Sequence, residues 1–106
     1  MTTNILTERN VYEYNDIEEM FPEHTYILRK YNVDSVYISK EIFQFSEGGY
    51  SSPVCALITC KNGNSYFGLH YSVLETLDSY DINRSVNLAM MKAVNNMKNG
   101  ITNRTV

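Results

Sequence analysis

The fold is decided by Val54-Cys55-Ala56-Leu57-Ile58-Thr59-Cys60, Lys61-Asn62-Gly63-Asn64 and Ser65-Tyr66-Phe67-Gly68-Leu69-His70-Tyr71. Two runs rich in β-branched and aromatic residues flank a short polar segment, which is the composition of two strands joined by a tight turn. Asn-Gly is the strongest short hairpin signal, because both turn positions need a positive φ. The stretch therefore predicts an antiparallel hairpin that turns at Asn62-Gly63, and its first strand is apolar enough to be central.

Downstream of the hairpin, the spacing of apolar residues predicts a helix from about Asp81 to Lys98. Asp81 is a good N-cap residue, and Gly100 is a natural stop just after the last turn. Apolar residues recur at intervals of four or three and make one stripe along the predicted helix: Ile82, Val86, Ala89, Ala93 and Met97. Such a stripe is typical of a helix that lies on a sheet.

Upstream of the hairpin, residues 36–45 are rich in valine, isoleucine, tyrosine and phenylalanine and predict a third strand. Residues 47–53 contain Gly-Gly and a proline and are typical of a loop. These two segments complete a predicted antiparallel sheet of three strands.

The N-terminal part predicts a broken helix. Asn15 and Asp16 suit a helix N-cap, and Pro22 breaks or restarts a helix. We expect residues 16–31 to be helical with a break near residue 22. Residues 1–14 show no clear period and are expected to form a flexible arm.

The chain is predicted to belong to the α+β class, with an N-terminal helix, a three-stranded antiparallel sheet and a C-terminal helix packed on the sheet. A length of 106 residues fits one domain, expected over residues 15–100 and followed by a tail at 101–106. The sheet has open edges, the chain has nine tyrosines, and its two ends carry charges of opposite sign. We expect these features to support a homodimer or a higher homo-oligomer.

Composition argues against several classes of protein. No apolar run approaches a membrane span, and the N-terminus lacks the pattern of a secretion signal, so a cytoplasmic protein without membrane contact is expected. A net charge of −3 disfavours direct nucleic-acid binding. Cys55 and Cys60 are expected to be reduced thiols on opposite faces of a strand.

No catalytic or metal site is predicted. His24 and His70 are the only histidines, and neither lies at ligand spacing from a cysteine or from the other histidine. The glycines occur in turns and form no phosphate-binding motif. We therefore expect a protein that is not an enzyme and that needs no cofactor.

A binding site is predicted near the start of the last helix. An anionic nucleotide-like ligand favours a cation, a helix N-terminus and aromatic rings. Tyr80, Asn83 and Arg84 offer these within one turn, and Phe67 and Tyr71 lie on the neighbouring strand. The alternative is a simple helix cap beside ordinary core aromatics.

Several short motifs occur in the same order as in a family of small tailed-phage proteins. They are Ile38-Ser39-Lys40-Glu41-Ile42-Phe43, Val54-Cys55-Ala56-Leu57, Lys61-Asn62-Gly63, Gly68, Tyr80-Asp81, Ala89 and Ala93. Across about residues 33–97 the chain resembles the family typified by gene product 49 of a coliphage and gene product 66 of a Shigella phage. In that family a helical turn precedes the first strand, so residues 33–38 are open to either helix or strand.

The resemblance implies a phage gene that is expressed in bacterial cytoplasm, from a family with no established enzymatic activity. The chain is also similar to phage anti-Thoeris sponges, oligomers that sequester cyclic ADP-ribose-type signals. The first functional hypothesis is therefore a sponge for a cyclic nucleotide or ADP-ribose-type ligand, with its site at Tyr80 and Arg84. The second is an anti-CRISPR-like inhibitor of a host defence or transcription complex, acting through the acidic segment from Glu13 to Glu23.

Overall fold

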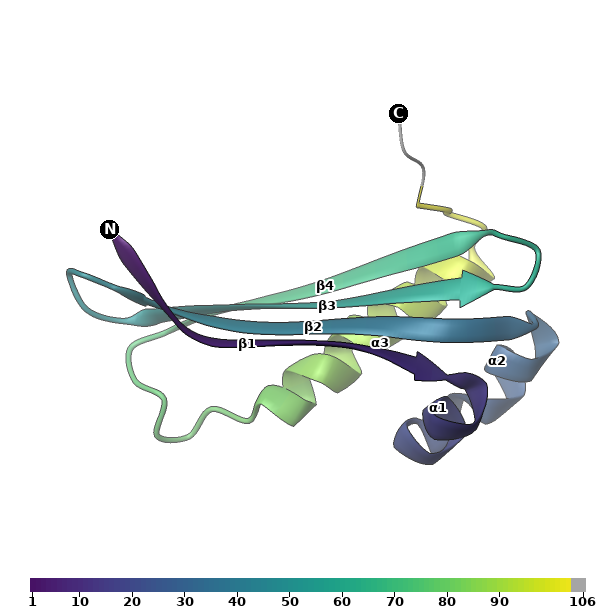
Figure 1. Ribbon diagram of the computed structural model, residues 1–106, viewed down its shortest axis with the longest axis horizontal. Helices are drawn as coiled ribbons and strands as arrows, with labels where there is room; N and C mark the ends of the chain where they lie inside the picture. Colours follow the sequence, from purple (N-terminus) through teal and green to yellow (C-terminus); the bar gives the residue numbers. More distant parts are fainter. Residues whose placement is uncertain (104–106) are drawn as a thin grey trace.

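The computed structural model describes residues 1–103 and has two layers, one sheet and one set of helices (Figure 1). Four antiparallel strands lie in the order β1-β2-β3-β4. All helical segments lie on the same side of this sheet. The elements are β1 Thr2–Glu13, α1 Tyr14–Met20, η1 Pro22–His24, α2 Thr25–Lys30, β2 Val33–Phe45, β3 Tyr50–Cys60, β4 Ser65–Leu74 and α3 Ile82–Lys98. The predicted α+β class and antiparallel sheet are confirmed, but the number of strands is not.

The strand that was not predicted is β1, and the prediction of a flexible arm over residues 1–14 was wrong. β1 pairs with β2 along its length, from Thr2 opposite Phe45 to Glu13 opposite Ser35. Most β1 side chains are exposed because the strand lies at the edge of the sheet. An edge strand with few buried residues lacks the alternation of apolar and polar residues by which strands are recognised.

The hairpin between β3 and β4 turns at Asn62-Gly63, as predicted, but not for the predicted reason. Gly63 has a φ of 90°, whereas Asn62 does not have a positive φ. The Asn62 side chain instead accepts a hydrogen bond from the backbone N–H of Asn64 at 3.0 Å. The backbone N–H of Cys60 closes the loop by donating to the Asn64 carbonyl at 2.8 Å. The Asn62 side chain thus stabilises the turn, where a second residue with a positive φ was expected.

The N-terminal helical segment has the predicted break. α1 ends before Phe21, and Pro22 begins η1. α1 starts earlier than expected, however, because Glu13 occupies the N-cap position in place of Asn15 or Asp16, and no side chain caps the helix. The open question over residues 33–38 is settled in favour of strand, since β2 begins at the buried Val33.

α3 packs on β3 and β4, as predicted for the last helix. The Asp81 carboxylate caps it, and Gly100 follows it with a φ of 68°. Its buried face is wider than the predicted stripe, because Met90 and Val94 are buried as well. The helix approaches β4 so closely that a Cβ atom at Gly68 would lie 2.1 Å from the Ala89 carbonyl oxygen.

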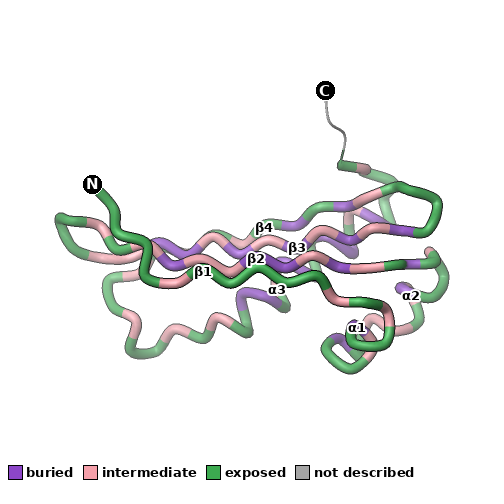
Figure 2. The backbone as a smooth tube through the Cα atoms, in the orientation of Figure 1, coloured by how far each residue is buried: buried purple, intermediate pink, exposed green. Residues whose placement is uncertain are grey.

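The two faces of the sheet differ. Figure 2 shows buried residues alternating with less buried ones along the central strands. On the helix side Val36, Ile38, Val54, Ala56 and Ile58 are almost fully buried in the core. The opposite side, termed the open face below, carries no helix (Figure 1). No helix within residues 1–103 is long and apolar enough to cross a lipid bilayer.

The outward edge of β4 is covered by three hydrogen-bond donors from Ser65 to Leu69. Lys92 Nζ donates to the Leu69 carbonyl at 2.8 Å, and Asn96 Nδ2 donates to the Phe67 carbonyl at 2.6 Å. The backbone N–H of Asn103 donates to the Ser65 carbonyl at 2.7 Å. An edge strand otherwise leaves such alternate carbonyls unpaired within the sheet. β1, at the other side of the sheet, is the second edge strand.

Candidate functional site

A hollow of about 290 Å³ lies between β4 and the start of α3, where the sequence predicted a binding site. β4 contributes the helix-side residues His70 and Ser72. The remaining lining comes from the connection to α3 and from its first turns: Ser79, Tyr80, Asp81, Arg84, Ser85 and Leu88. Two of the five predicted site residues, Tyr80 and Arg84, therefore line one hollow.

The other three predicted residues are not brought together with these two. Asn83 lines a different hollow, beside Met20 and Phe21. Phe67 and Tyr71 lie on the open face, because neighbouring residues of a strand point to opposite sides and Gly68 faces α3. The two aromatic rings expected to stack on a ligand are thus on the wrong side of the sheet, and that part of the site was wrong.

His70 and Ser72 were missed by the sequence argument. The alternation of side chains between the two faces of β4 could have identified them. Gly68 and the small residues Ala89 and Ala93 allow close contact between strand and helix. Once Gly68 is assigned to the helix side, His70 and Ser72 must share that side.

The Tyr80 hydroxyl hydrogen-bonds to two serine side chains beside the hollow. It lies 2.6 Å from Ser52 Oγ and 3.0 Å from Ser85 Oγ. Ser52 Oγ in turn donates to the Glu41 carbonyl at 2.8 Å. A phenol has one hydrogen, so Tyr80 donates to one serine and accepts from the other. The three hydroxyls therefore form a chain that links the connection before α3 to β3, β2 and α3.

Removing this hydroxyl is expected to lower stability. Tyr80→Phe leaves the buried serines with one partner fewer each, which costs about 1–3 kcal/mol of unfolding free energy. Urea denaturation measures the change. Tyr26→Phe is the control, because the Tyr26 side chain is 79% exposed and a surface change there is expected to stay within about 0.5 kcal/mol. Equal losses in the two variants would contradict a structural role for the chain of hydroxyls.

The N-terminus of α3 is already occupied by an anion from the protein itself. The Asp81 carboxylate accepts from the backbone N–H of Asn83 at 3.0 Å and from that of Arg84 at 3.4 Å. We expected free backbone N–H groups to attract a ligand here, and Asp81 takes two of them. The charge of a bound anion would therefore have to be met by side chains.

Those side chains are Arg84 and His70. Burial lowers the pKa of His70, and the positive charges of Lys92 and Arg84 lower it further. The imidazole is accordingly neutral at pH 7, so one of its nitrogens donates a hydrogen bond and the other accepts one. The hollow thus combines one guanidinium, one neutral imidazole and several serine hydroxyls with the opposing charge of Asp81.

The cysteines lie on opposite faces of β3, as predicted, and both are free thiols. Cys60 is buried on the helix side with its Sγ atom 4.0 Å from Met97 Sδ. Cys55 is half-buried on the open face, opposite Leu69. Burial raises the pKa of both thiols, so neither is an activated nucleophile.

Among residues 1–103, no group of three or more histidine, cysteine or acidic side chains could hold a metal ion. The chemistry available at the hollow is thus hydrogen bonding and the charge of one arginine. Comparison with family models, with curated proteins and with solved structures gives no match to this chain.

Proposed function

We propose that the protein is a small non-enzymatic binding protein that sequesters an anionic, nucleotide-derived signal in the hollow between β4 and α3. The phage-type resemblance gives the context, a protein that counters a bacterial host system as anti-Thoeris sponges do. The observation that carries the proposal is that Arg84 lines this hollow without an ion-pair partner among residues 1–103.

Arg84 differs from the other arginines among residues 1–103. Arg9 pairs with Glu41 at 2.7 Å, and Arg29 pairs with Glu18 at 2.9 Å. Arg84 is exposed at the mouth of the hollow and forms no ion pair with any described residue. A guanidinium without a carboxylate partner is free to bind a phosphate through two parallel hydrogen bonds.

The size of the hollow limits the ligand. Sites for small molecules usually measure roughly 300–1,000 Å³, and this one, at about 290 Å³, lies just below that range. It suits the phosphate and ribose of a nucleotide, with the base outside the hollow. Serine hydroxyls at Ser72 and Ser79 are donors that such a sugar phosphate requires.

Calorimetric titration with cyclic mononucleotides, cyclic dinucleotides and ADP-ribose isomers tests the proposal. We expect at least one ligand to saturate at one site per chain. A bound anion opposes the positive charges around His70 and raises its pKa, so the complex takes up a proton. Affinity is therefore expected to increase as the pH falls from about 7.5 to about 6. Absence of binding across the whole panel would overturn the proposal.

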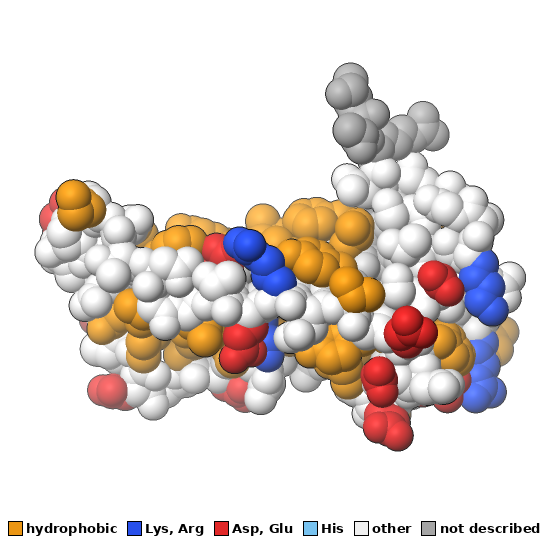
Figure 3. Space-filling view, in the orientation of Figure 1, with side chains coloured by type: hydrophobic (Ala, Val, Ile, Leu, Met, Phe, Trp, Pro, Cys, Tyr) orange, Lys and Arg blue, Asp and Glu red, His pale blue; other side chains and the backbone are white. Residues whose placement is uncertain are grey.

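The second candidate is an inhibitor that binds a host defence or transcription complex through its acidic surface. Figure 3 shows acidic side chains gathered over the α1 end of the molecule. Glu13, Asp16, Glu19 and Glu23 are exposed there, whereas Glu18 is paired with Arg29. A protein that binds no nucleotide, but loses its effect on host defence in an Asp16→Lys/Glu19→Lys variant, would favour this candidate.

A further inference from the structure

The open face of the sheet is apolar across its centre. Strand register brings its side chains into rows, because residues directly opposite each other in antiparallel strands point the same way. One row holds Val11, Tyr37, Leu57 and Phe67. The next rows hold Ser39, Cys55 and Leu69, then Glu41, Pro53 and Tyr71, then Phe43, Ser51 and Val73. Figure 3 shows hydrophobic side chains along the side of the sheet away from α3.

These side chains are also accessible. Phe67 is 40% exposed, Leu69 41%, Tyr71 54% and Val73 70%. An antiparallel sheet with one solvated face usually alternates apolar and polar residues, which leaves polar groups on the outside. β4 instead places four adjacent apolar side chains on its open side. A continuous apolar patch of this kind marks an interaction surface.

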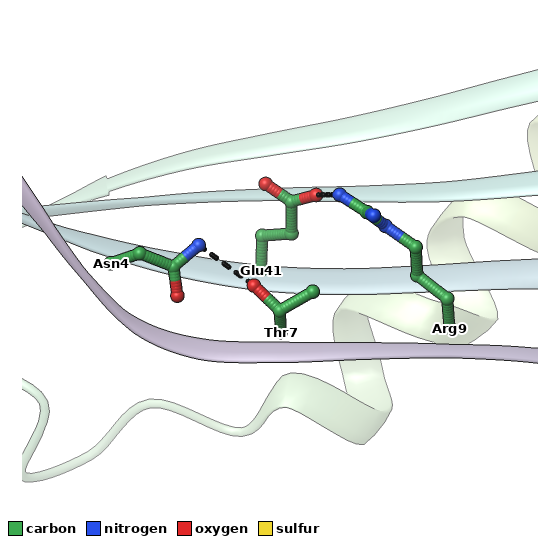
Figure 4. A network of polar contacts seen from close by, with 4 residues as sticks. All are labelled: Asn4, Thr7, Arg9 and Glu41. Atoms are coloured by element: carbon green, nitrogen blue, oxygen red, sulfur yellow. Dashed lines mark hydrogen bonds and ion pairs between the residues drawn. The ribbon is translucent and has the colours of Figure 1, made fainter.

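Charge on the open face comes from one ion pair between β1 and β2, Arg9 with Glu41, and from the exposed Glu13 at the end of β1. Arg9 donates to Glu41 across the β1–β2 pair at 2.7 Å, and Asn4 donates to Thr7 Oγ1 at 2.7 Å (Figure 4). Glu41 is 17% exposed and Arg9 57% exposed. The face therefore has an apolar patch over β4 and the adjoining residues of β3, with polar residues and one ion pair beside it over β1 and β2, and an apolar patch with a polar border is the anatomy of a protein interface.

The open face is large enough for a specific interface. Strands about 4.8 Å apart and about 3.4 Å of rise per residue give four strands and roughly seven residues a flat footprint of about 450 Å². Two such faces contribute about 900 Å², and the accessible area of corrugated side chains exceeds the flat footprint. A biological interface begins at about 1,000 Å². The pairing of two open faces reaches that size.

We propose that the open face binds a second copy of this chain, so that two sheets pack face to face in a twofold-symmetric dimer. The apolar patch itself carries no charge, so two identical copies can approach through it, although each chain has a net charge of −3. It lacks the unpaired cations that a nucleic acid or an anionic membrane requires. The hollow beside α3 lies on the other side of each sheet, so dimerisation leaves it accessible.

Sedimentation of the wild type against Leu69→Glu tests the dimer. We expect the wild type at tens of micromolar to sediment at twice the 12.2 kDa chain mass. Leu69→Glu places a charge in the apolar centre, and we expect its dissociation constant to rise at least about a hundredfold. Met91→Glu is the matched control, because Met91 is 44% exposed on α3, away from the open face, and that variant is expected to remain dimeric.

The reactivity of Cys55 provides a second readout. Cys55 lies opposite Leu69 on the open face, so a face-to-face dimer shields its thiol. We expect thiol labelling, located by mass spectrometry, to be slow at Cys55 in the wild type and faster in Leu69→Glu. Cys60 is buried on the helix side and is expected to label slowly in both.

Two results would overturn the proposal. One is a wild type that remains monomeric at tens of micromolar, which would mean that the open face binds a different protein. The other is a Leu69→Glu variant that stays dimeric with its circular dichroism spectrum unchanged, which would place the interface elsewhere, for example at the β1 edge. Nucleotide titration of Leu69→Glu separates this proposal from the functional one, because the hollow is intact in that variant.

Discussion

Gly68→Ala is expected to lower the free energy of unfolding by about 3 kcal/mol or more. A Cβ atom at this position would lie 2.1 Å from the Ala89 carbonyl oxygen and 2.5 Å from the Ala93 backbone nitrogen. Both contacts are with the helix backbone, so α3 must move away from β4 and loosen the core behind it. Overpacking costs typically about 1–3 kcal/mol, and a contact with backbone falls at or above the upper end of that range.

Two opposing effects act at this position, and their sizes decide the outcome. Alanine in a strand gains roughly 0.5–1 kcal/mol over glycine, because glycine loses more conformational freedom on folding. The steric cost is several times larger, so destabilisation prevails. Urea unfolding measures it, with Gly63→Ala as the control. Gly63 has a φ of 90° but no neighbouring atom within 4 Å of an added Cβ, so its cost is limited to about 1–2 kcal/mol of backbone strain. A neutral Gly68→Ala would contradict the close packing of α3.

Arg84→Ala is expected to weaken binding of an anionic ligand by about 2–4 kcal/mol, which is a factor of roughly 30 to 700 in the dissociation constant. Arg84 lines the hollow without an ion-pair partner among residues 1–103, and Asp81 occupies the nearby backbone N–H groups. The guanidinium therefore supplies most of the positive charge available to a phosphate. Stability should change little, because the side chain is exposed.

Two further variants separate the charge of Arg84 from its geometry. Arg84→Lys keeps the charge but lacks the planar fork, so we expect an intermediate affinity. Lys98→Ala removes the same charge from the far end of α3 and is expected to bind like the wild type. Isothermal titration with the best ligand of the panel measures all three variants. Binding that survives Arg84→Ala unchanged would move the site away from this hollow.

The hairpin and the last helix could be predicted from the sequence, because their signals are local. A turn at Asn62-Gly63 needs only the residues next to it, and the stripe from Ile82 to Met97 repeats with the period of one helix. β1 could not be predicted in this way. Its stability comes from pairing with β2, which is distant in the chain, and its own side chains are mostly exposed.

The site could be predicted only in part for a related reason. Tyr80 and Arg84 were placed correctly relative to each other because they lie next to one helix start. Phe67 and Tyr71 were assigned to the right strand but to the wrong face, which depends on where α3 packs. Because side chains alternate along β4, His70 and Ser72 lie on the helix side in place of Phe67 and Tyr71. Asp81 caps the helix as predicted, and its carboxylate occupies the backbone N–H groups that would otherwise bind an anion.

The donors along β4 also determine what kinds of assembly the sheet edges permit. Lys92, Asn96 and Asn103 bond to the carbonyls of three alternate β4 residues, so an incoming strand would have to break these contacts. Growth of a fibre by strand addition requires two complementary free edges on every molecule. Here β1 is open to such pairing along its length, whereas β4 is closed to it from Ser65 to Leu69. The last helix and Asn103 therefore hinder polymerisation through the sheet edges along the first half of β4.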